Sequence, residues 1–271
     1  MAAPVVQCGK RRGLSRTAAP GSIAAMSGTP PPPSPSGPPL GPEVDPTPRP
    51  LPARVPHRGA SVTLEPLHAD HSAELWAATQ APGAEAGWAY MGYGPFADEA
   101  AMRRHVAAFA AQHDPLAWAV RPGLTGTADG WLTLMEIAPA DSAIEIGNIW
   151  FSPRMQRTRA ATEAMFLLMR HAMDELGYRR LVWKCHALNA PSRAAAARLG
   201  FRYEGTLRAI KVIKGRLRDT AQFSILDDEW PARRDAIAAW LDDRNWDAAG
   251  RPQAPLSRVP QEPLSWVKAT G

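Results

Sequence analysis

The feature that most constrains the fold is one long amphipathic segment at residues 159–176. Apolar side chains recur there at the 3.6-residue period of an α-helix, and charged side chains lie mostly off that face. Gly177 follows the last apolar position, where helices commonly end. The pattern predicts a helix that buries one face against another layer. The apolar positions are Ala161, Ala164, Met165, Leu168, Ala172 and Leu176.

Segments typical of β-strands lie on both sides of this helix. Alternating or continuous apolar runs predict strands at 60–67, 116–120, 130–138, 142–151 and 179–187. Residues 201–213 and 216–228 are predicted to pair as a hairpin. Further helices are predicted at 70–80, 97–114, 190–200 and 229–245. The order is therefore strand, two helices, three strands, helix, strand, helix and two strands, followed by a closing helix, which indicates an α/β chain.

The two ends of the chain differ in composition from the middle. Residues 29–56 are rich in proline, which removes backbone donors and fixes φ. We therefore predict a disordered tail at 1–56, one folded domain at 57–244 and a flexible tail at 245–271. Residues 1–42 contain no Asp or Glu. This composition fits a transit peptide, or a disordered leader in a sequence whose true start codon encodes Met26.

Charge and cysteine content exclude several classes of protein. Residues 1–56 carry six Lys/Arg and two Asp/Glu, so the tail holds about four of the five excess positive charges. A basic balance confined to a tail is weak support for nucleic-acid binding. Cys8 and Cys185 allow no disulfide framework and no zinc spacing. No apolar run approaches the roughly 20 residues needed to span a bilayer. We expect a cytoplasmic protein with no metal and with neither nucleic acid nor membrane as partner.

Two stretches resemble a known family. "SPRMQRTRAATEAM", followed by "LNAPSRAAAARLGFRYEG", is similar to the GNAT acetyltransferases, and more closely to their RimJ/RimL-type branch. In that family a proline precedes the signature Q/R-x-x-G-x-G/A, and here Pro153 leads to residues 156–161. The resemblance covers roughly residues 58–230. It implies a mixed, mostly antiparallel sheet of about seven strands, splayed in the middle, with helices on both faces.

The resemblance also implies acetyl-CoA as cosubstrate. Free N–H groups at the start of the long helix, together with its dipole, would receive the pyrophosphate. Arg157 and Arg159 stand where the family has glycines, and either they bind phosphate oxygens or they are surface arginines. The pantetheine arm would pair with the strand edge at 149–151. The predicted cofactor contacts are Ile149, Trp150, Phe151, Gln156, Arg157, Thr158, Arg159, Ala160, Ala161, Thr162, Asn189 and Ser192.

Glu145 is the candidate general base. It lies six residues before Phe151, the spacing of the base in the histone acetyltransferase branch. Strand alternation places Glu145, Gly147, Ile149 and Phe151 on one face. A carboxylate among apolar neighbours has a raised pKa. The alternative is a strand glutamate that is exposed at an edge or paired with a lysine or arginine.

Other site residues follow from the resemblance. Many GNAT proteins place a tyrosine on the helix at 190–200 to protonate the departing thiolate. This helix has none, so Ser192 is the candidate donor, or else it only satisfies N–H groups in its own helix. Asn189 orients the pantetheine or caps that helix. Trp88, Tyr90 and Tyr93 form the lip of an acceptor pocket, or belong to a loop that packs on the core.

We therefore expect an acyltransferase that moves an acetyl group from acetyl-CoA to a primary amine. The amine attacks directly in a ternary complex, and it belongs to a protein N-terminus or to a small molecule. A homodimer stays open. The competing interpretation is a non-catalytic acyl-CoA-binding protein, because the expected glycines and tyrosine are missing.

Overall fold

The computed structural model describes residues 40–256. Within these residues, 45–256 belong to one compact unit, whereas residues 40–44 fall outside it and have neither helix nor strand. Of the tails expected at 1–56 and 245–271, residues 1–39 and 257–271 lie outside the described part of the chain. Everything below concerns the unit that begins at Asp45.

One eight-stranded sheet runs through this unit in the order β1-β2-β3-β4-β5-β6-β8-β7. Every neighbouring pair is antiparallel except β5 and β6, which are parallel. The prediction of a mixed, mostly antiparallel sheet is confirmed, and the extra strand is the two-residue β1. The strands are β1 His57–Arg58, β2 Val62–Pro66, β3 Leu116–Pro122, β4 Gly130–Ala138, β5 Ala143–Phe151, β6 Arg180–His186, β7 Arg202–Ile213 and β8 Arg216–Leu226.

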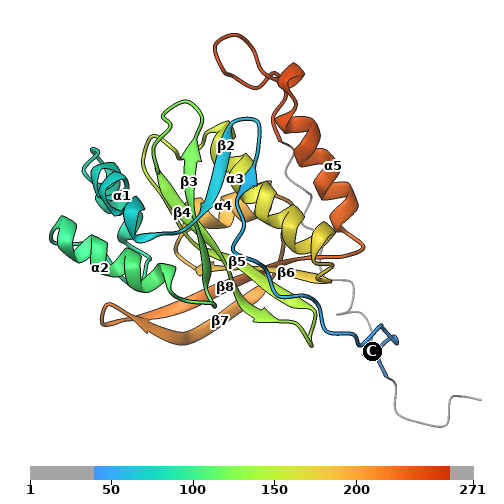
Figure 1. Cartoon of the computed structure of the whole chain (residues 1–271). Helices are drawn as coiled ribbons and strands as arrows, with labels where there is room; N and C mark the ends of the chain where they lie inside the picture. The colour runs from blue at the N-terminus through green and yellow to red at the C-terminus, as the bar shows by residue number, and fades with distance from the viewer. Residues whose placement is uncertain (1–39, 257–271) are drawn as a thin grey trace, which may run out of the picture. The chain divides into compact units, whose positions relative to one another are not determined.

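Helices cover both faces of the sheet (Figure 1). On one side, here called the α1 face, lie α1 (Ser72–Thr79) and α2 (Glu99–Ala110). On the other, the α3 face, lie α3 (Arg159–Arg170), α4 (Ala190–Arg198) and α5 (Trp230–Leu241). Short 3-10 turns occupy Ala69–His71, Ala84–Trp88 and Asp243–Asn245, and a π-helical turn at His171–Glu175 extends α3.

The apolar period of α3 explains why the main core lies on the α3 face. Ala161, Ala164 and Leu168 are buried there, as the sequence predicts, against alternate side chains of β2 to β6 and β8. A smaller core lies under α1 and α2 and is built largely from aromatic side chains, including Trp88 and Trp131. The sheet therefore separates two apolar layers, and each strand contributes alternate residues to them.

The sheet opens between β5 and β6. Their parallel pairing covers only Ala143–Glu145 on β5, opposite Arg180–Val182 on β6. Both strands continue beyond this point, β5 to Phe151 and β6 to His186, without pairing to each other. The expected splay is confirmed, and it leaves one edge of β5 free of strand partners from residue 146 onward.

A β-bulge in β5 changes which side chains face which layer. The register with β4 shifts between the pairs Trp131–Trp150 and Thr133–Gly147, and Asn148 adopts a positive φ of 49°. An extra residue in one strand reverses the alternation beyond it. The expectation that Glu145, Gly147, Ile149 and Phe151 share one face is therefore wrong. Glu145 and Gly147 lie on the α1 face, whereas Ile149 and Phe151 pack against the core on the α3 face.

The ordered domain extends beyond the predicted boundaries at both ends. The indole Nε1 of Trp118 donates to the Val55 carbonyl at 2.8 Å, and the Tyr178 hydroxyl donates to the Pro50 carbonyl at 3.1 Å. At the other end, Trp246 packs edge-on against Trp240 at 4.8 Å. Residues 45–56 and 245–256 thus contact the domain. Their assignment to unpacked tails, inferred from proline content and from the end of the last helix, needs correction.

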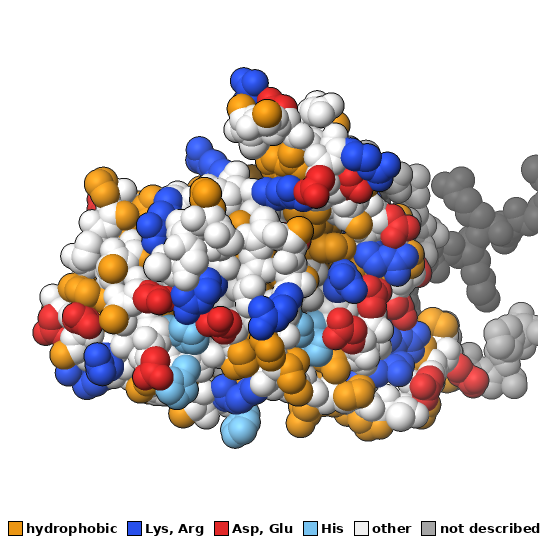
Figure 2. Space-filling view, turned by 45° about the horizontal axis from the view of Figure 1, so that its top comes forward, with side chains coloured by type: hydrophobic (Ala, Val, Ile, Leu, Met, Phe, Trp, Pro, Cys, Tyr) orange, Lys and Arg blue, Asp and Glu red, His pale blue; other side chains and the backbone are white. Residues whose placement is uncertain are grey.

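Charges of both signs are interspersed on the surface shown in Figure 2. Several form ion pairs, such as Arg121 with Glu65 at 3.2 Å and with Glu74 at 2.9 Å. Within residues 40–256, none of the helices has the length and apolar character needed to cross a membrane.

Candidate active site

Glu145 lies where the sheet begins to open. It is the last residue of β5 that pairs with β6, and the residue is only 5% exposed. Burial raises the pKa of this carboxyl to about 7, although the nearby Lys184 cation lowers it. A carboxylate that titrates near neutral pH can accept a proton from an amine and release it again. The expected raised pKa is confirmed.

Lys184 is a partner that the sequence patterns did not single out. It lies on β6, and its Nζ is 3.0 Å from a carboxylate oxygen of Glu145. The same ammonium group also contacts the Glu136 carboxylate. The alternative interpretation of Glu145, a glutamate paired with a lysine, is therefore also correct. The sequence feature that could have indicated Lys184 is the alternation of β6, which places Lys184 on the face opposite the apolar side chains of that strand.

The loop before α3 presents free backbone donors. Thr158 caps the helix, because its hydroxyl accepts the N–H of Ala161 at 3.0 Å. Among the residues that the structure describes, the backbone N–H groups of residues 157–160 donate to no acceptor. Such a run of donors at the positive end of a helix dipole is suited to an anion such as a pyrophosphate. Gln156 secures the loop by donating its side-chain amide to the Phe151 carbonyl at 3.0 Å.

The two arginines of this loop differ in their surroundings. Arg157 has a φ of +63°, the left-handed conformation for which glycine is normally used. Its side chain is exposed, and it makes no hydrogen bond or ion pair within residues 40–256. Arg159 instead turns towards the end of α5. Its guanidinium contacts the Leu241 carbonyl and the Asp243 carboxylate, the latter at 2.6 Å.

Arg159 also lies over the ring of Trp246, with 5.4 Å between the guanidinium carbon and the ring centroid. In this arrangement its charge is already satisfied by the C-terminal segment. The inclusion of Arg159 among the predicted cofactor contacts therefore needs correction. The Arg159 side chain joins α3 to the end of α5, and only Arg157 is left with a free guanidinium at the loop.

The start of α4 brings Asn189 and Ser192 together on the α3 face. The side-chain oxygen of Asn189 accepts the backbone N–H of Ser192 at 3.1 Å, so Asn189 is the N-cap of this helix. The Ser192 hydroxyl accepts the indole N–H of Trp183 at 3.1 Å. Cys185 packs in the same core, and burial raises the pKa of its thiol. This agrees with its interpretation as an inert packing residue.

The three aromatic residues of the expected acceptor lip have different positions. Trp88 is 2% exposed and stacks on Trp150, with ring centroids 4.7 Å apart, so its assignment to an acceptor contact needs correction. The Tyr93 hydroxyl is half-buried and donates to the side-chain oxygen of Asn148 at 2.5 Å, bracing the bulge. Tyr90 remains accessible, and its ring is 4.9 Å from that of His186 on β6.

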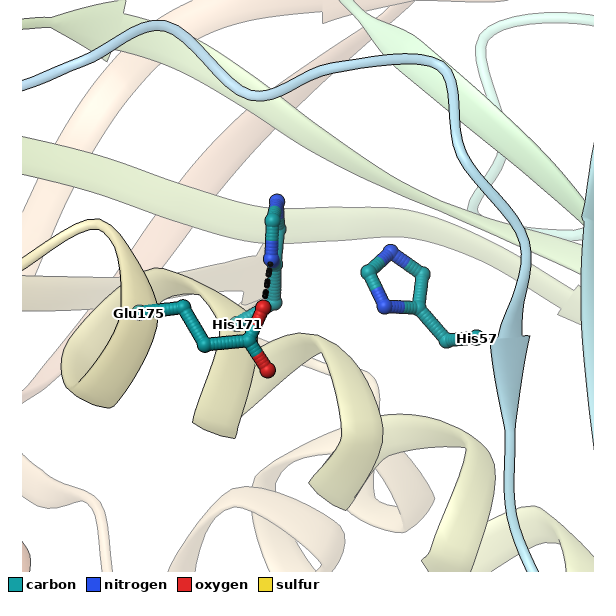
Figure 3. A group of neighbouring side chains, drawn as sticks. All are labelled: His57, His171 and Glu175. Carbon is teal, nitrogen blue, oxygen red and sulfur yellow. Dashed lines mark hydrogen bonds and ion pairs between the residues drawn. The ribbon is translucent and has the colours of Figure 1, made fainter.

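A group of potential metal ligands lies away from this site, at the end of α3. His57 from β1 faces His171 and Glu175 of the π-helical turn (Figure 3). The Nδ1 of His171 is 2.6 Å from a Glu175 oxygen, so that bond already occupies both atoms. Burial and the neighbouring His171 lower the pKa of His57 to about 4. The cluster thus attaches β1 to the end of α3.

Glu163 has a structural role that only the fold reveals. Its carboxylate accepts the N–H groups of Ala60 and Ser61, each at 2.7 Å, and the Ser61 hydroxyl at 2.6 Å. A side chain at Gly59 would collide with this carboxylate. Glu163 therefore fixes the turn between β1 and β2 to the first turns of α3.

Comparisons with known proteins agree with this architecture. Residues 61–202 match the family model of the acetyltransferase (GNAT) domain. A GCN5-related N-acetyltransferase from Brucella melitensis is 46% identical, with 78% of this chain and 96% of that chain covered and a TM-score of 0.76. The chain therefore belongs to the GNAT family of acetyltransferases and is an acyltransferase.

Two further solved structures extend the comparison. A probable GNAT-family acetyltransferase from Chromobacterium violaceum is 43% identical over 74% of this chain and 99% of that one, with a TM-score of 0.64. The microcin C7 self-immunity acetyltransferase MccE, solved with acetyl-CoA and AMP, shares the fold at 20% identity and a TM-score of 0.56, over 62% of this chain and 93% of that one. No curated protein matches this chain.

Proposed function

We propose that the protein is a cytoplasmic N-acetyltransferase of the RimJ/RimL type. It moves the acetyl group of acetyl-CoA to a primary amine by direct attack in a ternary complex, without a metal. The observation that carries the proposal is a buried carboxylate with a pKa near 7, at the point where β5 and β6 separate. A base that is half ionised at neutral pH suits the removal of a proton from an amine.

Acetyl-CoA would enter from the α3 face. The free N–H groups of residues 157–160 would hold its pyrophosphate, with Arg157 as the charged neighbour and Thr158 to Thr162 forming the first turn behind them. The unpaired edge of β5 at residues 149–151 would hydrogen-bond the amides of the pantetheine arm, as an added strand does. Asn189 and Ser192 would line the other side of the gap.

The acceptor would enter from the α1 face, where Glu145 lies. The amine nitrogen forms a bond to the acetyl carbon, and the bond from that carbon to sulfur breaks. Glu145 takes the proton that leaves the nitrogen, and the departing thiolate takes a proton from the side of the gap that holds Ser192. The Ser192 oxygen accepts the Trp183 N–H, so its hydroxyl hydrogen can point towards another acceptor.

Glu136 and Lys184 support this chemistry electrostatically. Lys184 contacts both carboxylates, which keeps the pKa of Glu145 from rising further with burial. A non-catalytic acyl-CoA-binding protein would have no need of a buried carboxylate that titrates near neutral pH. This is why we favour the enzyme.

The test is thioester turnover followed by the release of free thiol. Acetyl-CoA is offered with peptides of different N-terminal residues and with small amines such as ethanolamine and polyamines. Transfer to at least one class, with the acetylated amine confirmed by mass spectrometry, supports the proposal. Tight binding of acetyl-CoA without transfer to any amine would instead identify an acyl-CoA-binding protein.

A further inference from the structure

The β7–β8 hairpin carries a cluster of positive charge next to the proposed acceptor side. Between Gly205 and Arg218 the sequence contains five Lys/Arg and no Asp or Glu. Lys214 at the tip donates to the Trp88 carbonyl at 2.8 Å, which ties the hairpin to the loop between α1 and α2. The side chains of the other four, Arg208, Lys211, Arg216 and Arg218, form no hydrogen bond or ion pair with residues 40–256.

Two of these cations face each other directly. Lys211 on β7 and Arg218 on β8 are cross-strand partners in the antiparallel register. Like charges placed opposite one another destabilise a strand pair. The nearest carboxylate on the hairpin, that of Asp219, accepts the backbone N–H of Ala209 at 2.7 Å instead of pairing with a cation. An anion bound between Lys211 and Arg218 would remove their repulsion.

Buried polar atoms without partners lie beside this pair. The Nε of Arg218 is inaccessible to solvent and has no hydrogen-bond partner among the described residues. The same holds for the hydroxyl of Thr220, a residue that is 3% exposed and lies two positions further along β8, on the same face. Leaving such groups without partners costs free energy, which an oxygen-bearing ligand recovers.

These residues lie on the same face of the sheet as Glu145. Thr220 pairs with His186, and β6 continues from His186 through Lys184 to Val182, the strand partner of Glu145. These positions on β6 alternate with Trp183 and Cys185, which enter the core on the α3 face. Burial lowers the pKa of His186, and the charge of Arg218 lowers it further. Charge from the hairpin also reaches Glu145, where Lys211 is among the groups that act on the carboxyl.

We infer that the acceptor is a peptide N-terminus with an acidic side chain near its start, which Arg218 and Lys211 bind while Glu145 receives the proton of the amine. The inference rests on the proposed function and names its substrate class. A guanidinium binds a carboxylate through two parallel hydrogen bonds, and a lysine adds a point charge.

The spacing favours a peptide over a small amine. Along β6, Val182 and His186 are four residues apart, and Arg218 lies two residues beyond the partner of His186. At about 3.3 Å per residue this corresponds to about 20 Å of strand. An extended peptide spans the same distance in about six residues, and long side chains on both partners shorten the requirement. We therefore place the acidic side chain at the third to fifth residue of the peptide.

The experiment compares two eight-residue peptides that differ only in Glu or Gln at positions three to five. Phosphoethanolamine and ethanolamine form a second pair, which separates an acidic peptide from a small phosphorylated amine. Transfer is measured with the wild type and with Arg218→Gln and Lys211→Gln. Arg58→Gln is the matched control, because Arg58 is exposed on β1, at the opposite end of the sheet.

We expect kcat/KM for the Glu peptide to exceed that for the Gln peptide at least tenfold at low salt, and the ratio to shrink as salt rises. Arg218→Gln and Lys211→Gln should each reduce the ratio to below threefold. They should raise KM for the peptide and leave KM for acetyl-CoA unchanged. Arg58→Gln should keep the wild-type ratio.

Equal kcat/KM for the two peptides in the wild type would overturn the inference. A preference that survives both hairpin substitutions, or one found only for phosphoethanolamine, would do the same. If acetyl-CoA binds but no amine is acetylated, the proposed function fails. Calorimetry with CoA-saturated protein then decides the inference separately. Tighter binding of the Glu peptide that is lost in Arg218→Gln upholds it, and equal binding refutes it.

Discussion

Replacing Glu145 by glutamine tests the proposed base most directly. The substitution keeps the shape of the side chain and removes the proton acceptor, while Lys184 keeps its contact with Glu136. General bases typically contribute 10²–10⁴-fold to rate. We therefore expect Glu145→Gln to lower kcat/KM for the acceptor at least 10²-fold at pH 8. KM for acetyl-CoA should stay unchanged, because the carboxylate lies on the opposite face of the sheet from the loop before α3.

The pH profile gives a second, quantitative signature. With a pKa of about 7, Glu145 is about one tenth ionised at pH 6 and about nine tenths ionised at pH 8. The wild-type kcat/KM should therefore rise about tenfold across this range in addition to the titration of the acceptor amine. The Glu145→Gln profile should retain only the amine titration. Lys184→Met removes a cation that lowers the pKa of Glu145, so the inflection should move upward, by about one unit.

The pH dependence of the unfolding free energy should also reflect the buried Glu145 carboxyl. Its pKa is higher in the folded protein than in the unfolded chain, so its contribution is favourable below the unfolded value of 4.5 and is lost as pH rises through about 7. Each pKa unit corresponds to about 1.4 kcal/mol. The unfolding free energy of Glu145→Gln, relative to that of the wild type, should therefore rise by about 2–3 kcal/mol from pH 4.5 to pH 8. Urea unfolding at each pH measures this difference. If the inflection of the pH–rate profile persists in Glu145→Gln, or if kcat/KM for the acceptor falls less than threefold, the assignment of Glu145 as general base is refuted.

Three further predictions concern the loop before α3 and the N-terminal segment. Arg157→Gly keeps the positive φ and removes the guanidinium, so it should weaken the binding of acetyl-CoA by about 1–2 kcal/mol, measured by calorimetry. Arg157→Lys should lose less than half of that binding free energy. Equal affinity in the wild type and both variants would show that the N–H groups hold the anion alone. Arg159→Ala should leave the affinity for acetyl-CoA within twofold but lower Tm by about 3–6 °C, because the contacts with Leu241, Asp243 and Trp246 are lost. A loss of affinity with an unchanged Tm would contradict the structure. A chain that begins at residue 57 should melt about 6–12 °C below one that begins at residue 45, since the indole of Trp118 loses its acceptor, and equal Tm values would show that residues 45–56 contribute nothing.

The sequence by itself determined the order of the elements and the position of the loop before α3. Periodicity over a few residues is a local property, so the apolar stripe of α3, the hairpin of β7 and β8 and the free start of α3 could be predicted from neighbouring residues. Glu145 was found through the family resemblance, from its position six residues before Phe151 on an apolar strand. Its raised pKa followed from burial, which the strand pattern already indicated.

The tertiary structure decided the features that depend on which distant segments meet. The bulge at Asn148 reverses the facing of β5, and its cause lies in the register with β4 and in the Tyr93 hydroxyl, which are not local to the strand pattern. Arg159 binds Asp243, which is 84 residues away, so the direction of its side chain towards α5 could not be predicted from neighbouring residues. Residues 45–56 were predicted to be unpacked because they are rich in proline, which lacks a backbone donor. Carbonyl groups of this segment nevertheless accept hydrogen bonds from Trp118 and Tyr178.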